Sequence, residues 1–150
     1  MRIVRGVTMP IKEQQAFDGK AAEHIVISEL LKRNMEPFIP VLDRGIDIVV
    51  KSKKLGLYYE LQVKSNNSPI KENQKWFVFS GDLQIRENLI YVLVDMISND
   101  IWIIPSEVVK EHGNQCKTQF DLHLQHKIKR KGDTRELLLQ AYKNNWVLLE

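Results

Sequence analysis

The stretch from Arg44 to Ser65, RGIDIVVKSKKLGLYYELQVKS, constrains the fold more than any other part of the chain. Two runs rich in β-branched and aromatic residues, 45–51 and 57–64, flank a polar reversal near 53–56, and this pattern predicts a β-hairpin. Successive side chains of a strand point to opposite faces. One face should therefore carry Tyr58, Glu60, Gln62 and Lys64, and the other Leu57, Tyr59, Leu61 and Val63.

Asp47 is the acidic residue in the otherwise apolar first arm. A tight reversal pairs residues whose numbers sum to about 109, which sets Asp47 opposite Gln62 with Cβ atoms ~5 Å apart. Desolvating a carboxylate costs several kcal/mol unless a partner compensates it. Two interpretations stay open: a structural ion pair with Lys64, or a hard-oxygen site for Mg²⁺ or Mn²⁺ in which Lys64 lies beside an attacking water.

An acid, a β-turn, and then an acid or Gln, any residue and Lys resembles the PD-(D/E)XK nuclease superfamily. The most similar form is the QxK variant of Mrr-like restriction endonucleases and archaeal Holliday-junction resolvase-like small domains. This chain has Gly45-Ile46-Asp47 and Gln62-Val63-Lys64-Ser65, with fourteen residues between Asp47 and Gln62 (62 − 47 − 1 = 14). The resemblance implies an α/β restriction-endonuclease-like core, a central mixed β-sheet flanked by helices. It also implies an Mg²⁺- or Mn²⁺-dependent endodeoxyribonuclease.

The same resemblance implies a role for each residue of the motif. Catalytic roles fall to Asp47, Gln62, Lys64 and Glu23, and metal ligation to Asp47, Glu23, Gln62, the Val63 carbonyl and Glu60. A second register, Glu60-Leu61-Gln62, supplies the acid but places Gln where the family has Lys. Since the two registers differ by two residues they share a face, and Glu60 stays a metal-ligand candidate in either.

Helical signals begin near Pro10 and are strongest over 16–34, which predicts an amphipathic helix with an apolar row of Ala22, Val26 and Leu30. Glu23 lies beside that row, on the side that faces the core. By pattern alone it is a boundary glutamate, whereas Gly19-x-x-x-Glu23 resembles the family helix that supplies a Glu to the metal. His24 is expected at the surface.

Further elements follow from pattern and turn residues. We expect an edge strand over 37–41, a strand or buried segment over 76–79, a central strand over 89–95 paired with 101–104, and a half-buried strand over 120–124. A helix should begin at Pro105-Ser106 and end near His112, with Gly113 left-handed, and another should span 134–143. Residues 146–149 should dock back onto the core. No strong helix is predicted over 69–87, where the family usually has one.

Several polar and basic residues are placed to meet a sugar-phosphate backbone, although solvent exposure explains each of them equally well. These candidate nucleic-acid contacts are Arg44, Ser65, Asn66, Lys71, Lys75, Lys127, Lys129, Arg130 and Lys131.

The 150 residues suit one domain, 1–150, with 1–8 loose and 115–150 a C-terminal strand and helix extension. The net charge of +3 and pI near 8.9 are compatible with DNA, duplex or branched, as partner. A single cysteine and the lack of a signal segment favour the cytoplasm, and neither a nucleotide-binding loop nor zinc spacing is present. Cutting both strands usually needs a homodimer. The rival functions are a catalytically inactive nuclease-fold module that binds DNA or protein, and an unrelated α/β domain.

Overall fold

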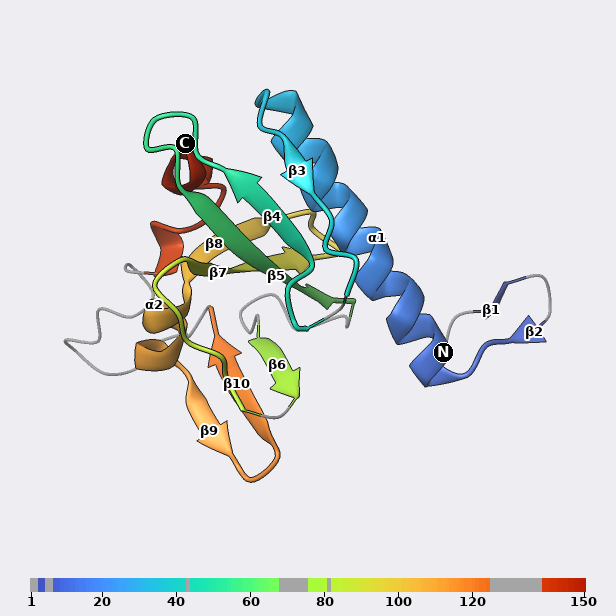
Figure 1. Ribbon diagram of the computed structural model, residues 1–150. Coiled ribbons are helices and arrows are strands. Elements are labelled where there is room, and N and C mark those ends of the chain that lie inside the picture. Colours follow the sequence, from blue (N-terminus) through green and yellow to red (C-terminus); the bar gives the residue numbers. More distant parts are fainter. Residues whose placement is uncertain (1–2, 5–6, 43, 68–75, 81, 125–138) are drawn as a thin grey trace.

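The computed structural model describes residues 3–4, 7–42, 44–67, 76–80, 82–124 and 139–150 (Figure 1). Its main sheet has five strands in the order β3-β4-β5-β7-β8. These are β3 (Pro37–Phe38), β4 (Ile48–Lys51), β5 (Tyr58–Asn66), β7 (Leu89–Asp95) and β8 (Ile101–Pro105). β5 and β7 run parallel while the other neighbours are antiparallel, so the sheet is mixed, as predicted.

The predicted hairpin is formed by β4 and β5, and its register is confirmed. Pairs run from Ile48–Leu61 to Lys51–Tyr58, and the residue numbers of each pair sum to 109. Gly56 allows the reversal through its φ of +65°, and the Ser52 N–H donates to the Leu57 carbonyl at 2.7 Å. The β3 segment pairs with β4 at the edge of the sheet, as its prolines predicted.

The strand predicted as central, β7, is buried over Leu89–Val94 and lies between β5 and β8. Alternate residues of β7 enter two separate hydrophobic cores, Ile90, Val92 and Val94 on one face and Leu89, Tyr91 and Leu93 on the other. A sheet buried on both faces explains why this strand is apolar at nearly every position.

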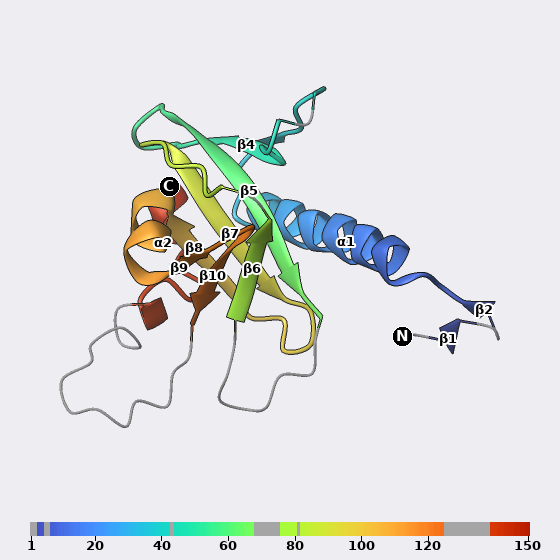
Figure 2. The same ribbon diagram turned by 90° about the horizontal axis from the view of Figure 1, so that it is seen from below.

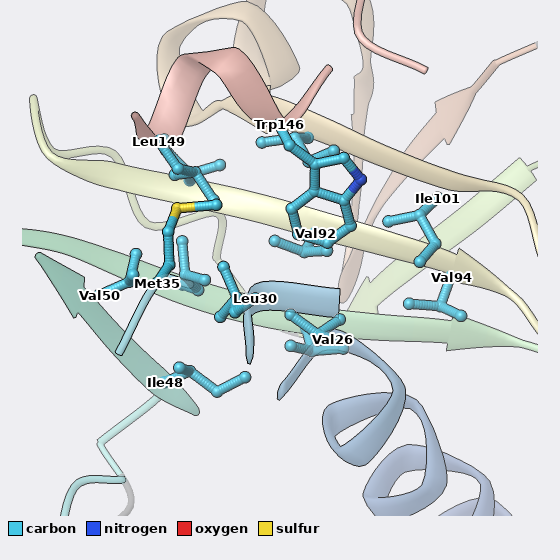
Figure 3. Packing of buried hydrophobic residues seen from close by; sticks show 14 of the residues in the cluster. Val26, Leu30, Met35, Ile48, Val50, Val92, Val94, Ile101, Trp146 and Leu149 are labelled. Carbon is cyan, nitrogen blue, oxygen red and sulfur yellow. The ribbon is translucent and has the colours of Figure 1, made fainter. Parts of the chain in front are cut away.

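Helix α1 (Ile11–Lys32) covers the first face through the predicted row of Ala22, Val26 and Leu30. It begins directly after Pro10, where the helical signals of the sequence also begin. It ends at Lys32, and Asn34 just beyond it has a left-handed φ of +55°, which lets the Met35 N–H donate to the Leu30 carbonyl at 3.0 Å. Figure 3 shows this core closed by Trp146 and Leu149 of the 3₁₀ helix η1 (Trp146–Leu149), which confirms that the chain end docks back.

The second face is covered by a three-stranded sheet and a short helix (Figures 1 and 2). Its strands, in the order β6-β10-β9, are β6 (Trp76–Ser80), β10 (Gln119–His123) and β9 (Asn114–Cys116). The buried alternation of β10 and the strand at β6 were both predicted. Helix α2 (Ser106–His112) follows β8 as predicted. Between β5 and β7 the described residues form β6 and no helix.

Gly113 is not left-handed, so this prediction was wrong. Its φ of −99° and ψ of 178° are extended. The residue is needed for a different reason: a Cβ there would lie 2.1 Å from Phe120 Cε1 and 2.8 Å from the Asp121 carbonyl oxygen. Glycine therefore lets the end of α2 touch β10.

The two ends of the chain also differ from the sequence pattern. Most of the helix predicted over 134–143 lies outside the described residues, and its described part is helical only at 139–140. At the other end, β1 (Ile3–Val4) and β2 (Val7–Thr8) pair beyond the N-terminal end of α1 (Figure 1). Within the described residues, no helix combines the length and the apolar character needed to cross a bilayer.

Candidate active site

Asp47 directly precedes β4, and its carboxylate is bonded to the backbone of β5. Its Oδ2 accepts a hydrogen bond from the Val63 N–H at 2.7 Å. The Asp47 N–H donates to the Leu61 carbonyl at 2.9 Å, so Asp47 and Ile48 both lie against Leu61. This one-residue slip resembles a β-bulge, which re-aims a side chain. The strict Asp47–Gln62 pair expected from the register is therefore replaced by a bond to the residue between Gln62 and Lys64.

Gln62 is half-buried and lies beside Gly45 instead. A Cβ built on Gly45 would be 3.7 Å from Gln62 Nε2 and 3.3 Å from Gln84 Nε2. The loop before β4, the middle of β5 and the segment before β7 therefore meet at Gly45. Its φ of +77° suits glycine, and the missing side chain leaves room for the two carboxamides.

Lys64 is half-buried and follows Gln62 by two residues in β5, so the two side chains lie on the same face of the strand. Among the residues that the structure describes, none forms an ion pair or hydrogen bond with its ammonium group. The structural Asp47–Lys64 pair of the sequence interpretation is thus not among the ion pairs of the described residues. An amine beside an acid-bearing strand and without such a partner is suited to meet an anionic ligand.

Glu60 shares the face of Gln62, but it has a cationic partner. Its Oε2 lies 2.8 Å from a guanidinium nitrogen of Arg86. The pair is partly exposed, with 42% of the Arg86 side chain and 25% of the Glu60 side chain accessible. The Glu60 carboxylate therefore lies against Arg86, in the segment that precedes β7.

Glu23 lies on α1, which packs against β5 from the first face of the sheet. Its side chain is 19% exposed, and its carboxylate binds the Lys20 ammonium at 2.8 Å. Gln62 and Lys64 lie in register with Tyr91 and Leu93, which belong to the second face. Helix α1, which carries Glu23, and the polar ladder of β5 therefore lie on opposite faces of the main sheet. Within the described chain, no three carboxylate, histidine or cysteine side chains form a group able to hold a metal.

No protein-family model matches the chain, and no curated protein sequence matches it either. Among solved structures, the bacterial homing endonuclease I-Ssp6803I matches with a TM-score of 0.63 and 22% identity, over 89% of this chain and 90% of that one. The chain has a restriction-endonuclease-like fold. A Holliday junction resolvase, Hjc of Archaeoglobus fulgidus, matches over 70% of this chain and 83% of its own, with 14% identity and a TM-score of 0.48. The fold predicted from the motif is confirmed, while the QxK variant stays a prediction.

Within this restriction-endonuclease-like fold, the predicted nucleic-acid contacts are only partly described. Arg44 is exposed before β4, and Ser65 and Asn66 are half-exposed at the end of β5. Asn67, which follows, donates to Asp18 of α1 at 2.9 Å, so the end of β5 is tied to the helix that bears Glu23. The other candidates, Lys71, Lys75, Lys127, Lys129, Arg130 and Lys131, lie outside the described residues.

Two residues that border the candidate site, Gln84 and Arg86, were missed by sequence reasoning. Both sit in a segment without regular secondary structure, so no periodicity marks them. The Tyr91 hydroxyl holds Gln84, accepting from its N–H at 3.2 Å and donating to its carbonyl at 3.0 Å. Burial raises the pKa of Tyr91, against the opposing hydrogen bond to the Gln84 backbone. The phenol therefore keeps its proton and can donate.

Proposed function

We propose that this chain is a metal-dependent nuclease that hydrolyses DNA phosphodiester bonds at a site formed by Asp47, Gln62 and Lys64. One observation carries the proposal: the Asp47 carboxylate is bonded to the N–H of Val63, the residue between Gln62 and Lys64 in β5. An acid is thereby held beside the part of β5 that carries an amide and an amine on one face. The restriction-endonuclease-like fold supports this assignment.

The oxygen donors near this point suit a hard divalent cation. Asp47 has a second carboxylate oxygen, Gln62 an amide oxygen and Val63 a carbonyl, and carboxylate, amide and carbonyl oxygens are ligands of Mg²⁺ and Mn²⁺. Glu23 would complete the set by exchanging Lys20 for the metal, and Glu60 by leaving Arg86. When bound, such an ion lowers the pKa of a water and offsets charge on the phosphoryl oxygens.

The chain's own groups would hold and balance the reacting phosphate. Asp47 keeps its carboxylate in place because its bond to Val63 is charge-assisted. Lys64 would orient the attacking water and stabilise the negative charge that builds on the phosphoryl oxygens. Gln62, half-buried beside Gly45, presents a neutral amide rather than a second negative charge. Preorganised groups of this kind act without reorganising during the reaction.

DNA is the proposed substrate because the similar solved structure is that of a homing endonuclease, and the chain is mildly basic. We propose a cytoplasmic homodimer, because two copies are needed to cut both strands of a duplex at once. Branched DNA remains an alternative substrate to a plain duplex.

A second candidate function is a nuclease-fold module that binds DNA without cutting it. This function is favoured because few carboxylates are available to a metal: Gln62 stands where the family motif has an acid, and Glu60 is paired with Arg86. Asp47 is then the acid directly bonded to β5. A site with one fixed carboxylate binds Mg²⁺ more weakly than a site with two.

The test compares Lys64→Ala with Lys53→Ala in a plasmid-cleavage assay with added Mg²⁺ and with a chelator. Lys53 is exposed at the hairpin turn, where its ammonium lies 3.4 Å from the Arg33 carbonyl, so it serves as the matched control. The proposal expects Mg²⁺-dependent cleavage by the wild type and by Lys53→Ala, and a loss of about a hundredfold or more for Lys64→Ala. DNA binding without cleavage by the wild type would instead support the inactive module.

A further inference from the structure

The segment Gln84–Arg86 runs along the polar face of β5 and is pinned there by two buried hydroxyl groups. Tyr91, 1% exposed, binds both the N–H and the carbonyl of Gln84. Ser106, fully buried, does the same for Arg86, accepting from its N–H at 3.1 Å and donating to its carbonyl at 2.8 Å. An exposed segment without helix or strand is thus fixed to β7 and to the start of α2.

Two side chains of this segment, those of Gln84 and Arg86, lie against residues of the proposed site. The Gln84 carboxamide lies against Gly45 and near Gln62, and the Arg86 guanidinium contacts Glu60. Tyr91 is also in register with Gln62 across the parallel strands β5 and β7. One buried tyrosine therefore sets the position of Gln84 relative to Gln62.

The chemistry of Gln84 suits a nucleic acid. Its carboxamide has two donor hydrogens and an acceptor oxygen, and it can bind a phosphate oxygen or a base edge. It is exposed, and no described residue forms a hydrogen bond with its side chain. A long polar side chain held at its backbone loses less entropy on binding than one on a free loop.

We propose that Gln84 contacts the nucleic acid beside the scissile phosphodiester, and that Tyr91 is the positioning residue that holds it there. The inference rests on the proposed nuclease function. It assigns the segment Gln84–Arg86 as the second side of the site, opposite the loop that carries Gly45 and Asp47. A purely structural alternative is that the Tyr91 hydroxyl only satisfies its own hydrogen-bonding needs.

The first experiment measures binding of a fluorescein-labelled DNA duplex of mixed sequence by anisotropy, without divalent metal. Gln84→Ala should weaken binding about tenfold, the effect of losing one hydrogen bond to a charged group. Gln140→Ala removes another exposed carboxamide and should bind as the wild type does. Wild-type affinity for Gln84→Ala would overturn the proposal.

Tyr91→Phe isolates the hydroxyl, because the ring that packs edge-on against Phe79 is kept. This variant should lose binding as Gln84→Ala does, and the double variant should lose no more than either single one, since both changes act through one side chain. In cleavage, KM should rise about tenfold while kcat changes less. A Tyr91→Phe protein that melts earlier but binds normally, or losses that add, would show a structural role only.

The failure of the nuclease function is distinguishable from the failure of this inference. A wild type that binds the duplex but does not cut it removes the nuclease function, while the anisotropy of Gln84→Ala still decides whether Gln84 touches DNA. A wild type that neither binds nor cuts removes both.

Discussion

The Asp47 carboxylate accepts a hydrogen bond from the Val63 N–H at 2.7 Å, which joins an acid at the start of β4 to the residue between Gln62 and Lys64. The bond fixes the carboxylate beside the backbone of β5. It also gives the Val63 N–H a partner next to the first residue of β4, where the ladder between β4 and β5 ends. Buried backbone donors are nearly always paired in this way. The same contact thus serves stability and the proposed chemistry, and substitutions can separate the two.

Asp47→Asn and Asp47→Ala should both abolish cleavage, but they should differ in stability. Asn keeps an oxygen that accepts from Val63, so the free energy of unfolding should fall by about 1 kcal/mol or less. Ala leaves the N–H unpaired and should cost about 1–3 kcal/mol. Urea unfolding measures the stabilities, with the exposed Asp82→Asn as control. Cleavage by Asp47→Asn at the wild-type rate would remove Asp47 from the catalytic set.

Glu23→Gln tests whether the glutamate of α1 reaches the metal from the first face of the sheet. If it does, the Mg²⁺ concentration for half-maximal cleavage should rise roughly tenfold, because a charged oxygen donor is replaced by a neutral one. The Lys20 ion pair is exposed, so little stability should be lost with it. Glu111→Gln on α2 is the matched control. An unchanged Mg²⁺ dependence in Glu23→Gln would restrict the ligands to β4 and β5.

The sequence predicts the fold well wherever apolar residues recur with the period of a helix or a strand. The alternation of 57–64 gave the correct faces of β5, and the row Ala22, Val26 and Leu30 gave the buried side of α1. Both patterns are set by the same requirement, since an apolar side chain on the wrong face loses its burial. The continuous apolar run of β7 likewise follows from a sheet covered on both faces.

The site is less predictable because its geometry departs from these periods. The one-residue shift in pairing at Asp47 turns its carboxylate toward the Val63 N–H. The alternation of apolar and polar residues does not predict this shift. Gln84 reaches Gly45 from an irregular segment, held by a tyrosine hydroxyl whose partner depends on the tertiary fold. Glycine is equally ambiguous: Gly113 is the expected residue for a left-handed cap, yet it is there because Phe120 lies too close for a Cβ.

Gly45→Ala should disturb both the backbone and the site, and Gly56→Ala separates the two effects. Each glycine has a positive φ, +77° and +65°, so each alanine should cost about 1–2 kcal/mol of strain. A Cβ at Gly56 meets nothing within 4 Å, whereas one at Gly45 lies 3.3 Å from Gln84 Nε2. DNA binding and cleavage should therefore fall in Gly45→Ala only. Equal activity of the two variants at matched stability would show that Gln84 tolerates displacement.

Glu29→Gln should reduce the change of the free energy of unfolding with pH in the acid range. Hydrogen bonds from Lys32 and then from Arg33 lower the pKa of Glu29 below its usual 4.5. Because the folded-state pKa is the lower one, this contribution is present above 4.5 and is lost as the pH falls through the folded-state value. Arg33 also stacks on Trp146, 4.6 Å from the ring centroid, so the interaction joins the end of α1 to η1. At neutral pH the variant should be about 0.5 kcal/mol less stable in urea, and the two unfolding curves should converge at low pH, whereas the control Glu13→Gln should follow the wild type throughout. A difference between Glu29→Gln and the wild type that persisted at low pH would mean that packing, and not charge, stabilises the contact between the end of α1 and η1.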